Sequence, residues 1–176
     1  CIDALLERNP TLDPAEVEDV VVGSASHVGE QDGNLARLAV VLSSLPITVG
    51  GMTINRFCSS GLQSIALAAN QIASGQSDVA MAGGTDSTSM RTRIDAGKAE
   101  QNQILLEEKR DIFMAMGYTG DVVARRYQVS REAQDQYGLQ SQQRYAAAVE
   151  KGYVSEEIVP MSATMLKVDK QTGDET

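Results

Sequence analysis

Cys58 and the small residues that follow it form the stretch of this sequence best suited to covalent chemistry. Residues 53–57 predict a short β-strand, and Ser59 and Ser60 begin an apolar segment with helical spacing. A thiol at a helix start meets unpaired backbone N–H groups and the positive end of the helix dipole, and both favour the thiolate form. Because the thiolate is the nucleophile, the stretch predicts a nucleophilic cysteine. A small buried cysteine without chemistry is the alternative interpretation.

The sequence supplies no obvious base beside this cysteine. His27 is the only histidine, and it lies in a polar loop flanked by glycines. A lone histidine in a loop is usually solvated, so we interpret His27 as a solvated residue in preference to a catalytic one. Two cysteines and one histidine at these spacings match no usual zinc pattern, so no metal site is expected. Because a nucleophilic cysteine usually needs a neighbouring base, these residues by themselves make an incomplete site.

Two further features each allow two interpretations. Gly83-Gly84 after a predicted strand could cradle a phosphate, but the following residues match neither a dinucleotide fingerprint nor a P-loop. A tight turn where backbones meet is the preferred interpretation. Met114 and Met116 could line an adaptable acyl pocket, or they could be core residues.

The segment after Cys58 predicts a buried helix. Its apolar residues recur at helical spacing: Leu62, Ile65, Ala66, Ala69, Ile72 and Ala73. No charged residue occurs from Ser59 to Ser77. A helix that is apolar nearly all round is expected to be covered on all sides.

The first half of the chain alternates between helices and strands. Strands are predicted over 19–24, 52–57 and 78–82, and helices over 2–8 and from Asn34, a natural N-cap, to before Pro46. This alternation implies an α/β fold with a mainly parallel sheet and helices on both faces.

Composition changes near residue 90. All five tyrosines lie between Tyr118 and Tyr153, and charged residues become dense. Helices are predicted over 116–127 and 131–151, followed by a short extended piece over 157–161. We therefore divide the chain into a core, 1–90, and an inserted subdomain, 91–176.

Composition also limits the function. The net charge of −9 argues against nucleic acid as a partner. No apolar run reaches the roughly 20 residues that span a membrane. Two cysteines make no disulfide framework, which favours a reducing compartment and a cytoplasmic location. The sequence starts with Cys1 rather than Met and stops in polar sequence, so we expect it to be a piece of a longer chain.

The stretch Asn55–Gln63 closely resembles the nucleophile motif of thiolases. Three other stretches resemble the same family in the same order: 29–37, with Gly-Glu-Gln and Asn-Leu-Ala-Arg; 78–86, with Ala-Gly-Gly; and 116–124, the Met-Gly-x-Thr segment. Two positions depart from the pattern: Gly120-Asp121 replaces the usual Ala-Glu, and Ala115 stands where many members carry His.

The resemblance implies a mechanism and a fold. The fold would be the αβαβα layered sandwich, of which this chain holds the N-terminal half and part of the inserted loop domain. Cys58 would take the acyl group of an acyl-CoA as a thioester, its backbone N–H would stabilise the oxyanion, and Met116 would border the acyl chain. Coenzyme A would be a substrate, with no cofactor or prosthetic group. A homodimer or homotetramer is implied.

The resemblance also implies what lies elsewhere. The family's catalytic His and second Cys belong to a C-terminal half absent from these residues, so the fragment alone is predicted to be inactive. Degradative 3-ketoacyl-CoA thiolases agree better with these motifs than biosynthetic ones do. The alternatives are a β-ketoacyl synthase, in which Ser-Ser-Ser tends to follow the cysteine, and a non-catalytic thiolase-like protein that binds lipid or serves as a scaffold.

Overall fold

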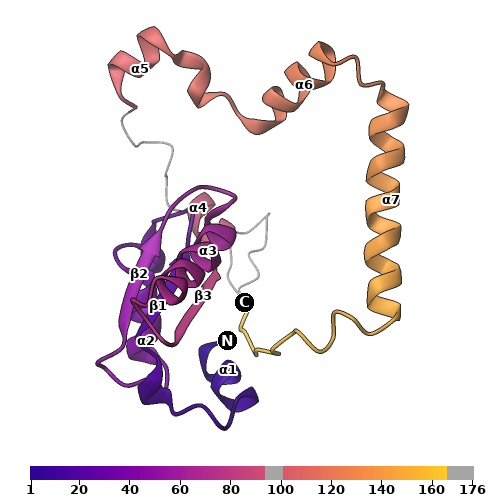
Figure 1. Ribbon diagram of the computed structural model, residues 1–176. Helices are drawn as coiled ribbons and strands as arrows, with labels where there is room; N and C mark the ends of the chain where they lie inside the picture. Colours follow the sequence, from indigo (N-terminus) through magenta and orange to yellow (C-terminus); the bar gives the residue numbers. More distant parts are fainter. Residues whose placement is uncertain (94–100, 166–176) are drawn as a thin grey trace, which may run out of the picture. The chain divides into compact units, whose positions relative to one another are not determined.

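The computed structural model describes residues 1–93 and 101–165 of the chain. It divides into two units, Cys1–Glu100 and Gln101–Thr176, which we describe separately (Figure 1). Residue 90, where composition places a boundary, lies in the last helix of the first unit.

The first unit is built on a three-stranded parallel sheet. Its strands are β1 (Asp19–Gly23), β2 (Gly50–Ile54) and β3 (Ala80–Gly84), in the order β2-β1-β3. All pairings in this sheet are parallel, which confirms the predicted α/β class. β2 lies earlier in the chain than predicted and β3 slightly later.

The first unit also contains helices. They are α1 (Ile2–Arg8), α2 (Leu35–Leu42), α3 (Ser60–Ala73) and α4 (Thr88–Arg93), with short 3-10 helices at Pro14–Glu16 and Gly29–Gln31. The side chain of Asn34 accepts a hydrogen bond from the Arg37 backbone N–H, so it caps α2 as the sequence predicts.

α2 and α3 cover opposite faces of the sheet. A Cβ built on Gly51 of β2 would strike the backbone of Arg37 in α2, whereas one built on Gly23 of β1 would strike the backbone of Ser60 in α3. In the sheet, Gly51 lies beside Val20, which points to the opposite face from Gly23. Because β2 and β3 flank β1 on opposite sides, right-handed crossovers place the two helices in this way.

The main apolar core lies on the α2 face. It contains Val17, Val20, Val40, Leu45 and Val49. On the other face, α3 buries Ser60, Ser64 and Ala68 against β1 and β3. This narrow contact is made of small residues, so the helix approaches the strands closely.

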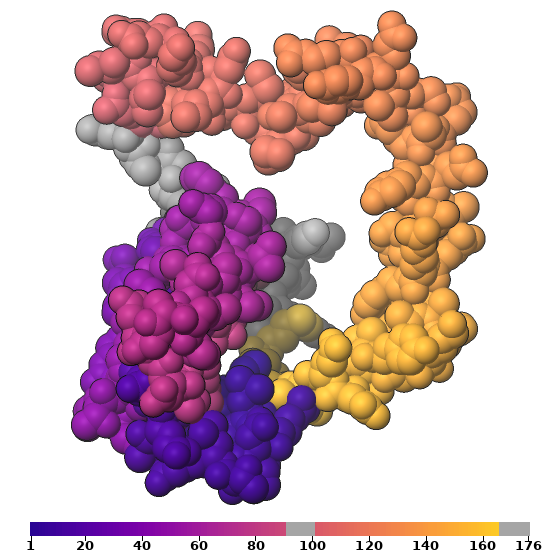
Figure 2. All heavy atoms as spheres, in the orientation of Figure 1, coloured from indigo at the N-terminus to yellow at the C-terminus, as the bar shows by residue number. Residues whose placement is uncertain are grey.

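The prediction that α3 is covered on all sides is wrong for the described chain. Leu62 is 73% exposed, and Ile65 and Ile72 are about half exposed. In Figure 2 the outer side of α3 is uncovered within the first unit. The physical reason is that one side of α3 faces β1 and β3, and within the first unit its other sides carry exposed apolar residues.

The second unit is helical. It contains α5 (Gln103–Glu108), a 3-10 helix at Arg110–Phe113, α6 (Met116–Arg126) and α7 (Arg131–Glu150). α6 and α7 agree with the predicted helices to within a residue, and Ser130 caps α7 through its hydroxyl. Of the short extended piece predicted over 157–161, residue 157 lies in a turn and residues 158–161 have no regular secondary structure. No residue within 101–165 is buried.

Within the described part of the chain, no helix combines the length and the apolar character needed to cross a membrane.

Candidate active site

Cys58 lies in the short connection between β2 and α3. β2 ends at Ile54, Ser59 is the N-cap of α3, and the helix begins at Ser60. The Cys58 side chain is an exposed free thiol. The structure therefore places this thiol at the entrance to a helix of 14 residues and leaves it open to reagents.

The backbone at Phe57 has an unusual conformation. Its φ angle is +49°, in the left-handed region that bulky residues rarely adopt. The Phe57 N–H donates to Asn55 Oδ1 at 2.8 Å, and its carbonyl accepts from Ser60 Oγ at 2.6 Å. This reversal of the chain brings Cys58 onto the helix end instead of continuing the strand.

Three backbone N–H groups at this end of α3 are unpaired. Among the described residues, nothing accepts from the N–H of Cys58, Gly61 or Leu62. The first N–H groups of a helix have no partner within the helix and carry the positive end of its dipole. Such groups stabilise a thiolate or the oxyanion of a tetrahedral intermediate.

Glycines allow the start of α3 to lie directly on the sheet. A Cβ on Gly23, at the end of β1, would lie 2.3 Å from the carbonyl carbon of Ser60. A Cβ on Gly84, at the end of β3, would lie 3.0 Å from the Cα of Gly61. Gly83 and Gly84 belong to β3, so the predicted turn is wrong, although Gly84 does mark a place where backbones meet.

An open depression surrounds Cys58. Its lining residues are Gly23, Phe57, Cys58, Ser60, Gly61, Gly84, Thr85 and Asp86. The Asp86 carboxylate accepts hydrogen bonds from the backbone N–H groups of Ala25 and Ser26, both at 2.9 Å. Asp86 therefore fixes the loop after β1, and both of its carboxylate oxygens accept hydrogen bonds from that loop.

His27 takes no part in this depression. It is exposed, and its Nε2 donates to the Ser24 carbonyl oxygen at 2.9 Å. Apart from Cys58, the lining contains one ionisable side chain, the carboxylate of Asp86. No group of three or more His, Cys, Asp or Glu side chains in the described ranges 1–93 and 101–165 is arranged to hold a metal ion.

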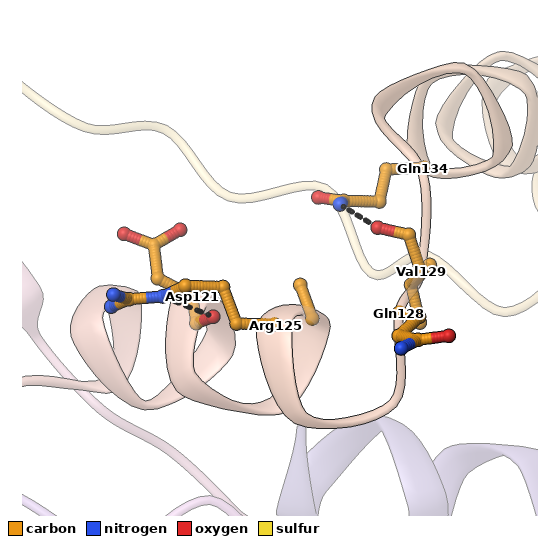
Figure 3. A pocket seen from close by; sticks show the side chains of 6 residues that line it. Asp121, Arg125, Gln128, Val129 and Gln134 are labelled. Carbon is orange, nitrogen blue, oxygen red and sulfur yellow. Dashed lines mark hydrogen bonds between the residues drawn. The ribbon is translucent and has the colours of Figure 1, made fainter.

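Met116 lies in the second unit, as the first residue of α6, and its side chain is 75% exposed. A separate pocket of this unit lies where α6 meets α7 (Figure 3). There Arg125 Nε donates to the Asp121 carbonyl, and Gln134 Nε2 donates to the Val129 carbonyl. Both side chains form hydrogen bonds with backbone carbonyls four or five residues earlier in the chain. None of the residues that line this pocket was predicted to be a site residue.

Sequence reasoning found Cys58 but missed the residues that shape its surroundings. Asn55 and Ser60 belong to the motif, yet nothing in the sequence indicates that their side chains form hydrogen bonds with the backbone of Phe57. Gly23 contacts α3 across a long stretch of sequence, and Asp86 holds a loop 60 residues earlier. A glycine directly after the apolar run Val20-Val21-Val22, inside the predicted strand 19–24, was the available signal for Gly23.

Comparison with known protein families matches the whole chain, residues 1–176, to the thiolase N-terminal domain. The chain belongs to the thiolase family. In this thiolase-family chain, the exposed Cys58 at the start of α3 is the cysteine of the stretch that resembles the family's nucleophile motif.

Individual relatives agree. The chain is 39% identical over 168 residues to a 3-ketoacyl-CoA thiolase of Bacillus subtilis, covering 96% of this chain and 42% of that protein. It is 37% identical over 182 residues to a beta-ketoadipyl-CoA thiolase of Acinetobacter baylyi, covering 94% and 45%. It is 39% identical over 173 residues to the 3-oxoadipyl-CoA/3-oxo-5,6-dehydrosuberyl-CoA thiolase of Escherichia coli K12, covering 89% and 43%. The thiolase-family chain thus spans less than half the length of these relatives.

Proposed function

We propose that the complete protein containing this chain is an acyl-CoA C-acyltransferase. It catalyses thiolytic cleavage of 3-ketoacyl-CoA, or the reverse Claisen condensation of an acyl-CoA with acetyl-CoA, through an acyl thioester on Cys58. The observation that carries the proposal is the exposed Cys58 thiol in the connection that enters α3, a helix whose first N–H groups are unpaired.

The proposed chemistry at Cys58 combines this geometry with the mechanism that the thiolase resemblance implies. In cleavage, the thiolate attacks the keto carbon of the substrate, and the developing oxyanion is stabilised by the Cys58 N–H. Collapse breaks the carbon–carbon bond, leaves the shortened acyl group on sulfur, and releases the acetyl-CoA carbanion, which takes up a proton. A second coenzyme A then gives its thiol proton to a base, and its thiolate attacks the thioester, takes the acyl group and releases Cys58 as a thiolate.

The proton transfers require groups outside the depression. Asp86 is engaged with two backbone N–H groups, and His27 is bonded to the Ser24 carbonyl. The family resemblance assigns the base to a His and the acetyl proton to a second Cys, both beyond residues 1–176. The 176-residue chain alone is therefore proposed to have no thiolase turnover.

The remaining parts of the proposal concern partners and placement. Two of the relatives are named for 3-ketoacyl-CoA and beta-ketoadipyl-CoA, which supports a 3-ketoacyl-CoA substrate, with coenzyme A as co-substrate and no other cofactor. Met116 borders the acyl chain. The protein is a homodimer or homotetramer, with residues 1–90 as core and 91–176 as inserted domain. Both cysteines are free thiols, which fits a reducing, cytoplasmic location.

Thiolysis kinetics test this function. The complete protein should cleave acetoacetyl-CoA when coenzyme A is supplied, and Cys58→Ser should reduce the rate to background while leaving the circular dichroism spectrum unchanged. A complete protein that binds acyl-CoA without cleaving it would instead support the non-catalytic alternative.

A further inference from the structure

Phe57 combines two costly features next to the nucleophile. Its φ is +49°, a conformation that a bulky residue adopts only when its surroundings enforce it. Its side chain is 76% exposed, so packing does not hold it in place. The restraint must therefore come from the backbone groups on either side of the residue.

The N–H side of Phe57 is held by Asn55. The Oδ1 atom of Asn55 accepts from the Phe57 N–H at 2.8 Å, which is an Asx turn. The Nδ2 atom of the same side chain donates to the Ala25 carbonyl at 3.4 Å. The Ala25 N–H is in turn bound by Asp86, so the turn is tied to a loop that is itself fixed.

The carbonyl side of Phe57 is held by Ser60. The Phe57 carbonyl accepts from Ser60 Oγ at 2.6 Å and from the Ser60 N–H at 3.0 Å. Ser60 Oγ also accepts from the Arg56 N–H at 2.8 Å. Ser60 is only 3% exposed, and Gly23 packs directly on its backbone, so this hydroxyl is held rigidly.

We propose that Asn55 and Ser60 are positioning residues that lock Phe57 in the left-handed conformation and thereby fix the Cys58 N–H and thiol at the open end of α3. The role in acyl transfer rests on the proposed function, whereas the geometric role does not. Without the lock, Phe57 relaxes to negative φ, and Cys58 leaves its position beside the unpaired N–H groups.

The experiment measures the rate at which iodoacetamide alkylates Cys58 in the complete protein, followed by peptide mass spectrometry, together with kcat and KM for acyl transfer. Asn55→Ala removes the acceptor and should slow alkylation and lower kcat by about 3- to 10-fold, the equivalent of one net hydrogen bond, with little change in KM. Asn55→Ser retains a hydroxyl that can accept from Phe57, so it should recover most of the loss. Ser60→Ala should behave like Asn55→Ala.

A glycine background isolates the conformational role. Glycine adopts positive φ without steric cost, so Asn55→Ala should have a much smaller effect in Phe57→Gly than in the wild type. Asn9→Ala is the matched control, because it removes an asparagine side-chain hydrogen bond of 2.9 Å on α1 and should leave alkylation unchanged.

Two results would overturn the proposal: unchanged alkylation in Asn55→Ala, or an equal loss in the wild-type and Phe57→Gly backgrounds. Should the protein lack acyl transfer altogether, the proposed function fails, while the alkylation series still decides whether Asn55 positions Cys58.

Discussion

Replacing Gly23 by alanine should displace the start of α3 and slow the chemistry of Cys58. Gly23 ends β1 directly beneath the first turn of the helix. An alanine Cβ would lie 2.3 Å from the Ser60 carbonyl carbon, 2.4 Å from its oxygen and 2.6 Å from the Gly61 nitrogen. All three atoms belong to the backbone, so no side-chain rotation relieves the contact.

The size of the effect follows from these distances. Ordinary van der Waals contact begins near 3.4 Å, so the nearest atom must retreat by 3.4 − 2.3 = 1.1 Å. Overpacking of this kind costs about 1–3 kcal/mol of stability. A misplacement of about 1 Å at a reacting group can cost about 100-fold in rate. Gly23→Ala should therefore lose far more acyl-transfer activity than its loss of stability alone explains.

Thermal unfolding and thiolysis kinetics of the complete protein measure both effects. Gly83→Ala is the matched control, because Gly83 lies on neighbouring β3 and a Cβ there meets nothing within 4 Å. It should change neither quantity appreciably. If Gly23→Ala folds with the wild-type melting temperature and the wild-type rate, the argument that this glycine seats the Cys58 helix is wrong.

Three further changes have defined outcomes. Asp86→Ala removes the acceptor of two backbone N–H groups in the loop after β1 and should lower the free energy of unfolding by about 1–2 kcal/mol in urea titrations, with Asp86→Asn losing less. The Ser44 hydroxyl, followed by its backbone N–H, lowers the pKa of Asp3, so this contact stabilises the fold above the ordinary carboxyl pKa, and the stabilisation is lost as pH falls through the lowered value. Because Asp3 is exposed, the contribution is below about 1 kcal/mol. When the pH is lowered, the urea concentration at the unfolding midpoint should fall less in Asp3→Asn than in the wild type. Met116→Ala should raise KM for longer acyl-CoA substrates by roughly 10-fold relative to acetyl-CoA, because the mutant loses an apolar contact with the acyl chain. Equal changes in KM for both substrates would show that Met116 does not contact the acyl chain.

The pattern of residues predicted much of the first unit. Alternating apolar runs and helical spacing gave the parallel sheet, and Asn34 gave the start of α2. The helical spacing of the apolar residues after Cys58 predicted the helix that begins there. Spacing, propensity and capping act between residues close in sequence and define the individual helices and strands. The parallel pairing joins distant strands, and it was inferred from the alternation of helices and strands.

The rest depends on contacts between distant residues. The lack of charge in α3 predicted burial on all sides, but packing partners decide burial, and within the first unit the sheet covers one side of the helix. The clash that makes Gly23 necessary involves Ser60, and Asp86 binds a loop that precedes it by 60 residues. The sequence also carried no sign of the left-handed conformation of Phe57, because the residue is not a glycine. Its cost is offset by a hydrogen bond that the Phe57 N–H donates to Asn55 and one that its carbonyl accepts from Ser60.

Covalent trapping on Cys58 tests the central claim most directly. The complete protein is mixed with acetyl-CoA, quenched in acid, digested and analysed by peptide mass spectrometry. We expect one acetyl group, carried by Cys58 and removed when coenzyme A is added before the quench. An unmodified Cys58, or an acetyl group on another side chain, would contradict the account.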